Sequence, residues 1–325
     1  MRASGTTKRG AREGGHELST VAFVLNPARV RRAARVAARC AAAATAAGWD
    51  WLLAETTADD PGTGQAHQAV DAGARLVFAV GGDGTVRACA QALAGSAVPL
   101  AIVPRGTANL AARALGLPSR LEAALACGFA GHERRIDLAA ADGIPFVAMA
   151  GLGTDAAVVS ATPAGLKAGA GWLAYAAAGA WHAAGHRAAF DISLDGTPLA
   201  CQARSVVVGN AGLLPGGFVL LPGARLDDGV LDVGVLAPAS LLGWARVAHR
   251  VLTASRRDDR YLVRYQARRV EVRADRELPR QVDGEVIEPG RALTVTVLPA
   301  ALLVRVPGPA PVRVRPALAG MPGPA

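Results

Sequence analysis

The sequence predicts two domains, an α/β domain with glycine-rich loops and a second domain that is mainly an antiparallel β-sandwich. In the first 137 residues, short apolar runs rich in β-branched residues alternate with segments of helical period, which is typical of a parallel sheet covered by helices. Glycine-rich turns follow two of these runs, at Gly81 and at Gly106. From Pro145 onward, short alternating polar and apolar runs are separated by turn signals such as Asp195-Gly196, which favours antiparallel strands.

The composition is that of a folded chain and limits the classes of partner that we expect it to bind. The 325 residues are 51% hydrophobic, which is enough for two cores and excludes a disordered protein. The formal charge of +9 comes from arginine, because Lys8 and Lys167 are the only lysines, and it favours anionic partners such as phosphates or an acidic membrane face. Aromatic residues are only 4% and no zinc-finger spacing occurs, so nucleic acid is not an expected partner. The four cysteines lie far apart and are expected to be reduced thiols.

We divide the chain at changes of composition. Residues 1–19 are basic and glycine-rich without the apolar stretch of a secretory signal, so we expect a disordered tail. Residues 20–137 would form the α/β domain, joined by a C-terminal strand at about 300–307, and residues 138–299 the β-rich domain. Residues 308–325 are a Pro-rich tail that we also expect to be disordered.

The first domain opens with a buried strand over 20–25 that ends at Asn26-Pro27. A helix over 30–48 and a strand over 49–55 follow, and Thr57 comes after that strand. Both polar positions also have a plain structural interpretation. Asn-Pro is a common turn initiator, and Thr57 suits a helix cap.

The most informative stretch lies between residues 76 and 109. The apolar run 76–80 predicts a buried strand, and Gly81-Gly82-Asp83-Gly84-Thr85 follows it. Glycines without Cβ atoms let a phosphate approach the backbone, and a helix from Val86 would point its N-terminal amides at the anion. A second strand over 98–103 leads to Pro104-Arg105-Gly106-Thr107-Ala108-Asn109 and another helix. Two such units in tandem predict a nucleotide cleft.

The two loops together resemble the diacylglycerol kinase catalytic domain family, which includes bacterial lipid kinases and sphingosine or ceramide kinases. A glycine cluster alone would indicate only a tight turn, and NAD kinases carry a loop similar to GGDGT. The continuation PRGTANLAARALGLP, which begins at Pro104, resembles the lipid kinase branch. The resemblance spans about residues 20 to 307 and implies an α/β nucleotide-binding domain of the NAD kinase/diacylglycerol kinase-like type.

The resemblance implies that ATP lies on the glycine loops and beside the ends of neighbouring strands. Two positions depart from the family pattern: Ala28-Arg29 stands where the family has Ser-Gly, and Leu110-Ala111 stands where it has Asp-Phe. The residues implied in nucleotide binding are Asn26, Pro27, Thr57 (with Thr56 as the alternative), Gly81, Gly82, Asp83, Gly84, Thr85, Val86, Arg87, Gly106, Thr107 and Asn109.

A metal site in the second domain is also implied by the resemblance. The matching stretches are Gly153 with Asp155, Val208-Gly209-Asn210, Gly216-Gly217 and the run from Pro222 to Leu231. In the family pattern, Mg²⁺ would be bound by the Asp228 side chain and by the backbone carbonyls of Arg225 and Val230. Oxygen ligands suit this hard cation. An Asp-Gly hairpin turn would have the same sequence.

The segment Gln281–Glu285 resembles the late DGE motif of the family, and Leu298–Leu302 resembles its closing strand. The resemblance implies that Glu285, with Asp283 beside it, accepts the proton of the attacking alcohol. Two carboxylates this close would raise the pKa of one of them. The alternative is an ordinary hairpin.

Three further features carry less information. Asp137 is expected to pair with Arg134 or Arg135, or else to lie behind the metal. The apolar stretch 167–181 is shorter than the ~20 residues that span a bilayer, so we expect a packed helix. The histidines at 182 and 186 lack the carboxylate of an HExxH motif, and a metal site is not expected there.

The sequence therefore predicts a two-domain lipid kinase that uses ATP and Mg²⁺ to phosphorylate a lipid such as diacylglycerol or a sphingoid lipid. We expect it in the cytoplasm, associated peripherally with the anionic inner face of a membrane, and a second copy of the chain is a further candidate partner in a homodimer. The docking candidates are the basic tail and the Arg256 to Arg260 run, at about 1 kcal/mol per charge. A NAD kinase-like enzyme and a non-catalytic, membrane-associated nucleotide sensor are the alternatives.

Overall fold

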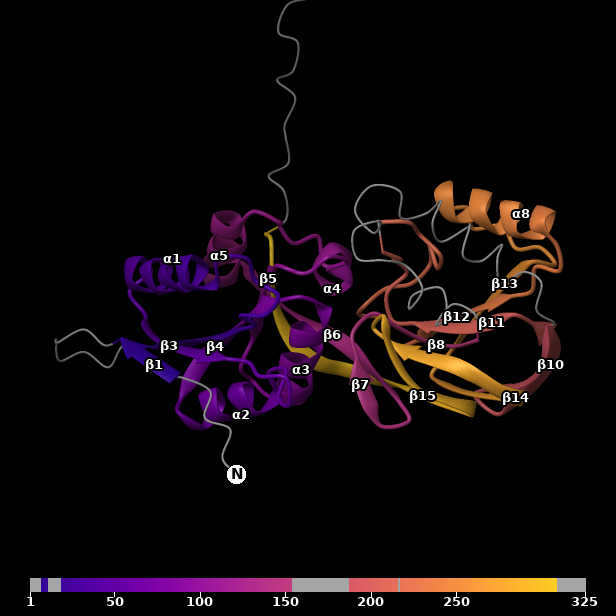
Figure 1. The fold of residues 1–325 in the computed structure, drawn as a ribbon, viewed down its shortest axis with the longest axis horizontal. Helices are drawn as coiled ribbons and strands as arrows, with labels where there is room; N and C mark the ends of the chain where they lie inside the picture. The colour runs from indigo at the N-terminus through magenta and orange to yellow at the C-terminus, as the bar shows by residue number, and fades with distance from the viewer. Residues whose placement is uncertain (1–6, 11–18, 154–186, 216, 309–325) are drawn as a thin grey trace, which may run out of the picture.

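The computed structural model describes residues 7–10, 19–153, 187–215 and 217–308. The chain forms two lobes side by side, an N-terminal lobe of mixed strands and helices and a C-terminal lobe composed mainly of strands (Figure 1). The expected helix over 167–181, the histidines at 182 and 186, Asp155 and Gly216 lie outside the described residues.

The N-terminal lobe is built on a parallel sheet with the strand order β3-β2-β4-β5. Helices α1 and α5 cover one face of this sheet and α2 and α3 cover the other (Figure 1). Both faces are therefore buried, which explains the continuous apolar runs of these strands. The elements are β2 (Thr20–Leu25), α1 (Ala33–Ala46), β3 (Asp50–Glu55), α2 (Thr63–Asp71), β4 (Ala74–Gly81), α3 (Asp83–Leu93), β5 (Leu100–Pro104), α4 (Leu110–Ala114) and α5 (Leu121–Ala130).

The C-terminal lobe is antiparallel throughout its described strand pairs, as expected for the sandwich. Its inner faces carry one apolar cluster that includes Phe146, Phe190 and Val233. One amphipathic helix, α8, covers part of it (Figure 1). The elements are β6 (His132–Ala141), β7 (Ile144–Phe146), β8 (Met149–Gly153), β9 (Ala188–Leu194), β10 (Thr197–Ala203), β11 (Ser205–Gly209), β12 (Leu231–Leu236), α8 (Leu241–Leu252), β13 (Leu262–Ala267), β14 (Arg269–Val282) and β15 (Glu285–Val306).

The long strand β15 links the two lobes into one continuous sheet. Its first half pairs with β14 of the C-terminal lobe, and its last residues lie beside β5 of the N-terminal lobe, where Val304 faces Leu100. The pairing of β15 with β6 is interrupted between Leu298 and Leu302, and Ala300 there has a φ of 49°. Because of this irregularity the Ala300 amide is not paired within the sheet, and it donates a hydrogen bond to the Asp137 carboxylate instead.

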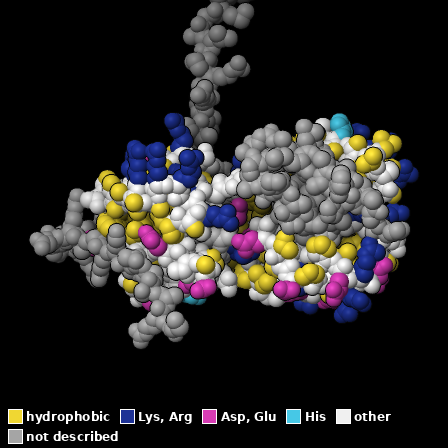
Figure 2. All heavy atoms as spheres, in the orientation of Figure 1, with side chains coloured by type: hydrophobic (Ala, Val, Ile, Leu, Met, Phe, Trp, Pro, Cys, Tyr) yellow, Lys and Arg dark blue, Asp and Glu magenta, His cyan; other side chains and the backbone are white. Residues whose placement is uncertain are grey.

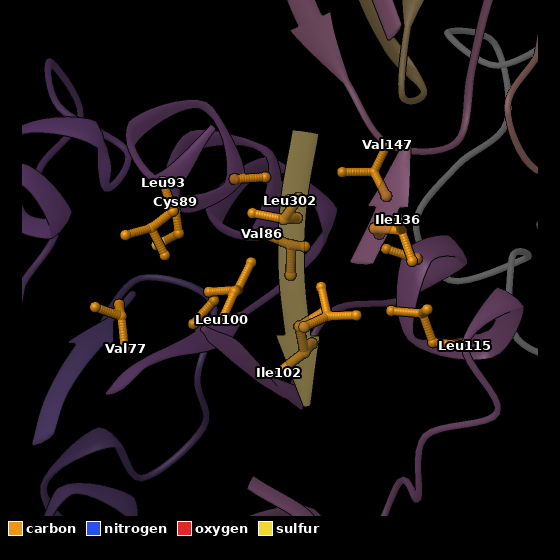
Figure 3. Packing of buried hydrophobic residues seen from close by; sticks show 14 of the residues in the cluster. Val77, Val86, Cys89, Leu93, Leu100, Ile102, Leu115, Ile136, Val147 and Leu302 are labelled. Atoms are coloured by element: carbon orange, nitrogen blue, oxygen red, sulfur yellow. The ribbon is translucent and has the colours of Figure 1, made fainter. Parts of the chain in front are cut away.

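A shared apolar core holds the lobes in one arrangement. Leu302 on β15 packs between Val86 and Ile102 of the N-terminal lobe on one side and Ile136 and Val147 on the other (Figure 3). All five side chains are at most 4% exposed. Close packing of this kind tolerates little relative movement, so the site between the lobes is largely preformed.

The structure corrects four expectations about single elements. Thr7–Gly10 form a strand, β1, paired with β3, so the expectation of disorder is wrong for these four residues. Helix α3 begins at Asp83 instead of Val86, because an aspartate in the first turn is favourable at the positive end of a helix dipole. The alternating pattern of residues 261–273 predicts one strand, whereas the structure has two, β13 and β14. Helix α8 was not predicted at all.

Candidate active site

The two glycine loops pack directly against each other at the carboxyl ends of β4 and β5. A Cβ atom built on Gly106 would lie 2.5 Å from the Gly82 Cα, and one built on Gly82 would lie 3.1 Å from the Gly106 Cα. The Arg105 amide donates to the Gly81 carbonyl at 2.7 Å. Both glycines are therefore required for this approach, which leaves a bare backbone surface at the N-terminus of α3.

Asn26 reaches this surface from the end of the neighbouring strand β2. Its amide nitrogen Nδ2 donates to Thr85 Oγ1 at 3.3 Å, and its backbone N–H donates to the Val80 carbonyl at 3.1 Å. A Cβ on Gly81 would lie 2.5 Å from the same Thr85 hydroxyl. The structure thus brings Asn26, followed by the exposed Pro27, together with the first glycine loop, as expected of parallel strand ends.

Asp83 connects the two loops. Its Oδ1 accepts from the Leu110 amide at 2.6 Å, at the start of α4. Burial and, to a smaller extent, the charge of Asp283 raise the pKa of Asp83, the amides of residues 109–111 counteract both, and the resulting pKa is about 6. The resemblance implies that Asp83 binds the nucleotide, and in this structure its carboxylate also caps the N-terminus of α4.

Asn109 shapes the second loop from within. Its φ is 48°, its Oδ1 accepts from the Gly106 amide at 2.9 Å, and its Nδ2 donates to the Gly106 carbonyl at 2.9 Å. Asparagine tolerates this left-handed conformation better than most residues. Leu110 and Ala111, which replace the family's Asp-Phe, are both 2% exposed and belong to the shared core. Thr107, within the loop itself, is exposed.

The hydroxyl and the amide of Thr57 both form hydrogen bonds within a turn that precedes α2. Its Oγ1 accepts from the Asp60 amide at 3.1 Å, and its own amide donates to the Asp60 carbonyl at 3.0 Å. Asp60 Oδ1 in turn accepts from the amides of Gly62 and Gly64, both at 3.1 Å. Thr57 makes these bonds in a turn ahead of α2, whose N-cap is Gly62 without a side-chain cap bond, so the helix-cap interpretation of Thr57 is wrong. The alternative residue, Thr56, is only 6% exposed.

The hairpin between β14 and β15 brings the C-terminal lobe onto the first glycine loop. Arg87 on α3 forms an ion pair with Glu285, and its Nη1 donates to the Val282 carbonyl at 3.1 Å. A Cβ on Gly84 would lie 2.8 Å from Glu285 Oε1. The Glu285 side chain is 57% exposed, so its carboxylate lies at the N-terminus of α3 and remains open to a substrate.

Asp283 has a different environment from Glu285. It is 8% exposed, has a φ of 48°, and accepts from the amides of Val147 at 3.0 Å, Ala148 at 2.8 Å and Met149 at 3.1 Å. Burial raises the pKa of Asp283, and the three amides counteract this. The carboxylate whose charge couples to this group is Asp83, not Glu285 as the sequence interpretation supposed. Asp283 therefore anchors the hairpin that presents Glu285.

Asp137 joins β6, β15 and the loop that was expected to hold a metal. Its Oδ1 accepts from the Ala300 amide and its Oδ2 from the Gly229 amide, both at 2.7 Å. The expected pairing of Asp137 with Arg134 or Arg135 is wrong, since Arg134 pairs with Asp227 at 2.6 Å. Only the irregularity in β15 makes the Ala300 amide available, and no sequence pattern signalled it.

The loop over 225–230 offers oxygen atoms to a cation. Asp228 Oδ1 accepts from the Val230 amide at 3.3 Å. Burial raises the pKa of the nearby Asp232 to about 6, and the charge of Asp228 contributes to this. Two carboxylates that repel each other, with the carbonyls of Arg225 and Val230 in the same loop, have the donor chemistry that suits Mg²⁺. In the described ranges, no cluster of three or more His, Cys, Asp and Glu side chains could hold a metal ion.

Asn210, the residue that follows β11, supports the same region. Its Nδ2 donates to the carbonyls of Asp137 at 2.8 Å and Val147 at 3.2 Å. The side chain is buried, and its Oδ1 has no hydrogen-bond partner among the described residues. Asn210 was recognised only as part of a motif, and its role in joining β6 to the β7–β8 connection follows from the structure alone.

Comparison with known families accounts for nearly the whole described chain. The diacylglycerol kinase catalytic domain matches residues 20–141, and the YegS C-terminal NAD kinase beta sandwich-like domain matches residues 148–306. A probable lipid kinase YegS-like protein of Pseudomonas fluorescens is 35% identical over 270 residues, which are 82% of this chain and 89% of that protein. Its counterpart in Pseudomonas aeruginosa strain UCBPP-PA14 is 39% identical over 255 residues, which are 75% and 81% of the two chains.

A solved structure shares the fold. The crystal structure of a putative diacylglycerol kinase from Bacillus anthracis str. Sterne aligns with a TM-score of 0.77 over 91% of this chain and 98% of that one. The two sequences are 22% identical, so this likeness concerns the fold alone.

Proposed function

We propose that this chain, which belongs to the family of YegS-like lipid kinases, transfers the γ-phosphate of ATP to a hydroxyl of a lipid such as diacylglycerol or a sphingoid lipid. The observation that carries the proposal is the Arg87–Glu285 ion pair, which joins the glycine loop of one lobe to a carboxylate of the other. A phosphate donor and an alcohol acceptor must meet at such a boundary for direct transfer.

The nucleotide would lie on the backbone surface formed by the two glycine loops. Gly82 and Gly106 leave it free of side chains, and the first amides of α3 point their partial positive charge toward it. Asn26 and Thr85 supply polar groups at its edge. This arrangement suits a polyphosphate, because anions are bound by unpaired backbone amides at helix N-termini.

Glu285 would act as the general base. The lipid oxygen forms a bond to the γ-phosphorus, the bond from that phosphorus to the bridging oxygen breaks with its electron pair leaving on ADP, and the alcohol proton passes to the Glu285 carboxylate. Asp283 holds the hairpin in place through its three amide bonds and is a positioning residue. The Arg87 guanidinium holds the Glu285 carboxylate beside the glycine loop.

Mg²⁺ fits two places in this scheme. The Asp228 side chain with the carbonyls of Arg225 and Val230 would hold one ion, supported from behind by the bond between Asp137 and the Gly229 amide. A divalent cation bound with ATP supplies neutralisation of phosphate charge.

The lipid acceptor requires contact with a membrane. None of the helices in the described part of the chain is long and apolar enough to cross one. We therefore include a peripheral association with an anionic membrane surface in the proposal, with the lipid headgroup as the partner and no role for nucleic acid.

The decisive experiment is transfer of labelled γ-phosphate from ATP into a total lipid extract, with NAD as a parallel acceptor. Incorporation into a lipid, lost in the Glu285→Gln variant, supports the proposal. Incorporation into NAD would instead identify the NAD kinase-like alternative. ATP binding without any transfer, in wild type and variant alike, would identify a nucleotide sensor and overturn the proposal.

A further inference from the structure

Helix α8 has an apolar face that the described residues of its own lobe leave exposed. Leu241 is 65% exposed, Leu242 is 63% exposed and Leu252 is 52% exposed, the three highest values among the large hydrophobic residues described. The buried face of the same helix, with Gly243, Val247 and Val251, packs on the C-terminal lobe. A surface helix normally places polar residues on its outer face, so these leucines need another explanation.

The position of the leucines along α8 makes them one stripe. At 100° per residue, Leu241, Leu242, Ala245, His249 and Leu252 fall on the side opposite Val247. All five are exposed. Space-filling shows yellow hydrophobic side chains gathered over α8 beside a histidine (Figure 2). An apolar face of this length on a single short helix suits an interface with lipid rather than a protein core.

Four arginines on α8 and in the segment after it have no carboxylate partner among the described residues. Arg246 and Arg260 lie over the ring of Tyr261, at 5.7 and 4.8 Å from its centre. Arg256 and Arg257 are exposed in the loop that follows α8. Of the acidic residues nearby, Asp258 pairs with Arg264 and Asp259 pairs with Arg250, so neither neutralises these four cations.

A second basic surface lies on the same side of the molecule. Helix α1 and the turn before it carry exposed arginines, and no acidic residue occurs between Pro27 and Gly48. Lys and Arg side chains gather over α1 on the side of the N-terminal lobe that matches the α8 side of the C-terminal lobe (Figure 2). Within the described ranges only Arg39 among these arginines has an ion-pair partner, Glu122 at 2.5 Å. The arginines are Arg29, Arg31, Arg32, Arg35 and Arg39.

We propose that this face, with the α8 leucines and the α1 arginines, docks on an anionic lipid bilayer. The leucines enter the boundary between headgroups and acyl chains, and the arginines of α1 and of the α8 surroundings bind the anionic headgroups. The proposal rests on the proposed function, because a kinase for a bilayer lipid must reach its acceptor. It replaces the basic N-terminal tail with a folded surface as the main contact.

The arrangement predicts two separable parts of the binding energy. Attraction between arginines and headgroups weakens as salt shortens the screening length from ~8 Å at 0.15 M to ~3 Å at 1 M. Burial of leucine does not depend on salt in this way. Two sets of substitutions therefore differ in salt dependence as well as in affinity.

The test is co-sedimentation of the full chain with phosphatidylcholine vesicles and with vesicles that also contain phosphatidylglycerol, at low and high salt. The triple variant Leu241→Ser, Leu242→Ser, Leu252→Ser should bind the anionic vesicles roughly 100-fold more weakly at every salt concentration. The double variant Arg31→Gln, Arg35→Gln should lose about 30-fold at low salt and little at high salt. Matched controls are Ile144→Ser, an exposed residue on β7, and Arg273→Gln with Arg291→Gln on β14 and β15.

The proposed docking surface would be overturned if both variant sets bound the vesicles as tightly as the wild type. It would also be overturned if the control variants lost as much vesicle affinity. A wild-type dimer that the leucine substitutions dissociate would assign the stripe to a second copy of the chain and would also overturn it. Phosphate transfer is measured separately, with a short-chain lipid in solution. Docking without transfer would refute the proposed function alone, and transfer without docking would refute this inference alone.

Discussion

Arg87 on α3 of the N-terminal lobe forms an ion pair with Glu285 on β15 of the C-terminal lobe. The pair closes the contact between the two lobes at the glycine loop, where the phosphates of ATP would lie. Because the Glu285 side chain is 57% exposed, the pair adds little to stability, and exposed ion pairs typically contribute 0 to about 1 kcal/mol. The main effect of the ion pair is to position the Glu285 carboxylate beside the first glycine loop.

The first prediction follows from that position. Glu285→Gln should lower kcat by about 100-fold or more, since loss of a positioned general base typically costs 10²–10⁴-fold. ATP affinity and melting temperature should change little, because the side chain is exposed and contributes no buried contact. Steady-state kinetics, ATP titration and thermal unfolding measure the three quantities. Glu122→Gln, which breaks the exposed Arg39–Glu122 pair, is the matched control. A parallel loss of ATP affinity and rate would show that Glu285 belongs to the nucleotide pocket.

The second prediction separates the two roles of Asp83. Asp83→Ala should abolish turnover and lower the free energy of unfolding by about 1 kcal/mol, because its Oδ1 caps α4 through the Leu110 amide. Asp83→Asn retains an oxygen acceptor for that amide, so near pH 4, where Asp83 is also protonated, it should keep nearly wild-type stability, while still losing turnover at neutral pH. Denaturant unfolding and phosphate transfer distinguish these outcomes. Full activity of the Asn variant would mean that the Asp83 charge serves only the fold.

The contrast between these two residues shows what the sequence could predict. Gly82, Gly106 and Asp83 were recognised because their neighbours in sequence make a strand, turn and helix whose geometry is local. The pairing of Arg87 with Glu285 joins residues 198 apart in sequence, and no local pattern specifies that. Thr57 was assigned to nucleotide by resemblance, whereas its bonds are those of a local turn.

Missed elements have similar physical causes. The partners of Asp137 include an amide that only an irregularity in β15 exposes, and sequence patterns locate such irregularities poorly. Gly243, Val247 and Val251 repeat every four residues, which is a helical pattern, but α8 was overlooked because it lies in a region otherwise rich in strand signals. The exposed leucines then disguised its amphipathic pattern.

The third prediction concerns pH. Burial raises the pKa of Asp83 to about 6 from an ordinary value of 3.8, so the folded state holds this proton more tightly than the unfolded state. The resulting stabilisation is fully present below pH about 4 and is lost as the pH rises to about 6, by roughly 1–3 kcal/mol. Asp83→Asn should therefore flatten the fall in the free energy of unfolding across this range.

Two variants make the pH experiment specific. Asp232 has a pKa raised to about 6 by burial, so Asp232→Asn should flatten the same window. Asp195 has a lowered pKa because it accepts from the amides of Arg268 and Arg269, so its contribution is lost as the pH falls. Asp195→Asn should leave the decline between pH about 4 and 6 intact. Urea unfolding at each pH gives the curves, and an unchanged decline in Asp83→Asn would show that Asp83 ionises normally.

The fourth prediction tests the buried bonds of Asp137. Asp137→Ala leaves the amides of Gly229 and Ala300 without an acceptor in a position where the carboxylate is 3% exposed. Hydrogen bonds to a charged group typically contribute about 1.5–3 kcal/mol each, so loss of the two bonds should lower the free energy of unfolding by roughly 2–5 kcal/mol. Asp142→Ala is the control, since Asp142 also bonds an amide of β15, at Thr294, but is more exposed. Equal losses in both variants would refute a special role for Asp137.

The last prediction concerns the proposed metal. Asp228→Asn weakens the one side-chain ligand of the loop over 225–230, so the Mg²⁺ concentration for half-maximal activity should rise about 10-fold or more, while the rate at saturating Mg²⁺ changes less. Asp227→Asn is the matched control, because Asp227 forms ion pairs with Arg134 and Arg225 and is not one of the proposed Mg²⁺ ligands. A second measurement does not depend on activity. The charge of Asp228 helps to raise the pKa of Asp232, so bound Mg²⁺ should lower the pKa of Asp232 in wild type and have less effect in Asp228→Asn. Mg²⁺ titrations that leave the Asp232 pKa unchanged in wild type would place the required cation elsewhere, on the nucleotide alone.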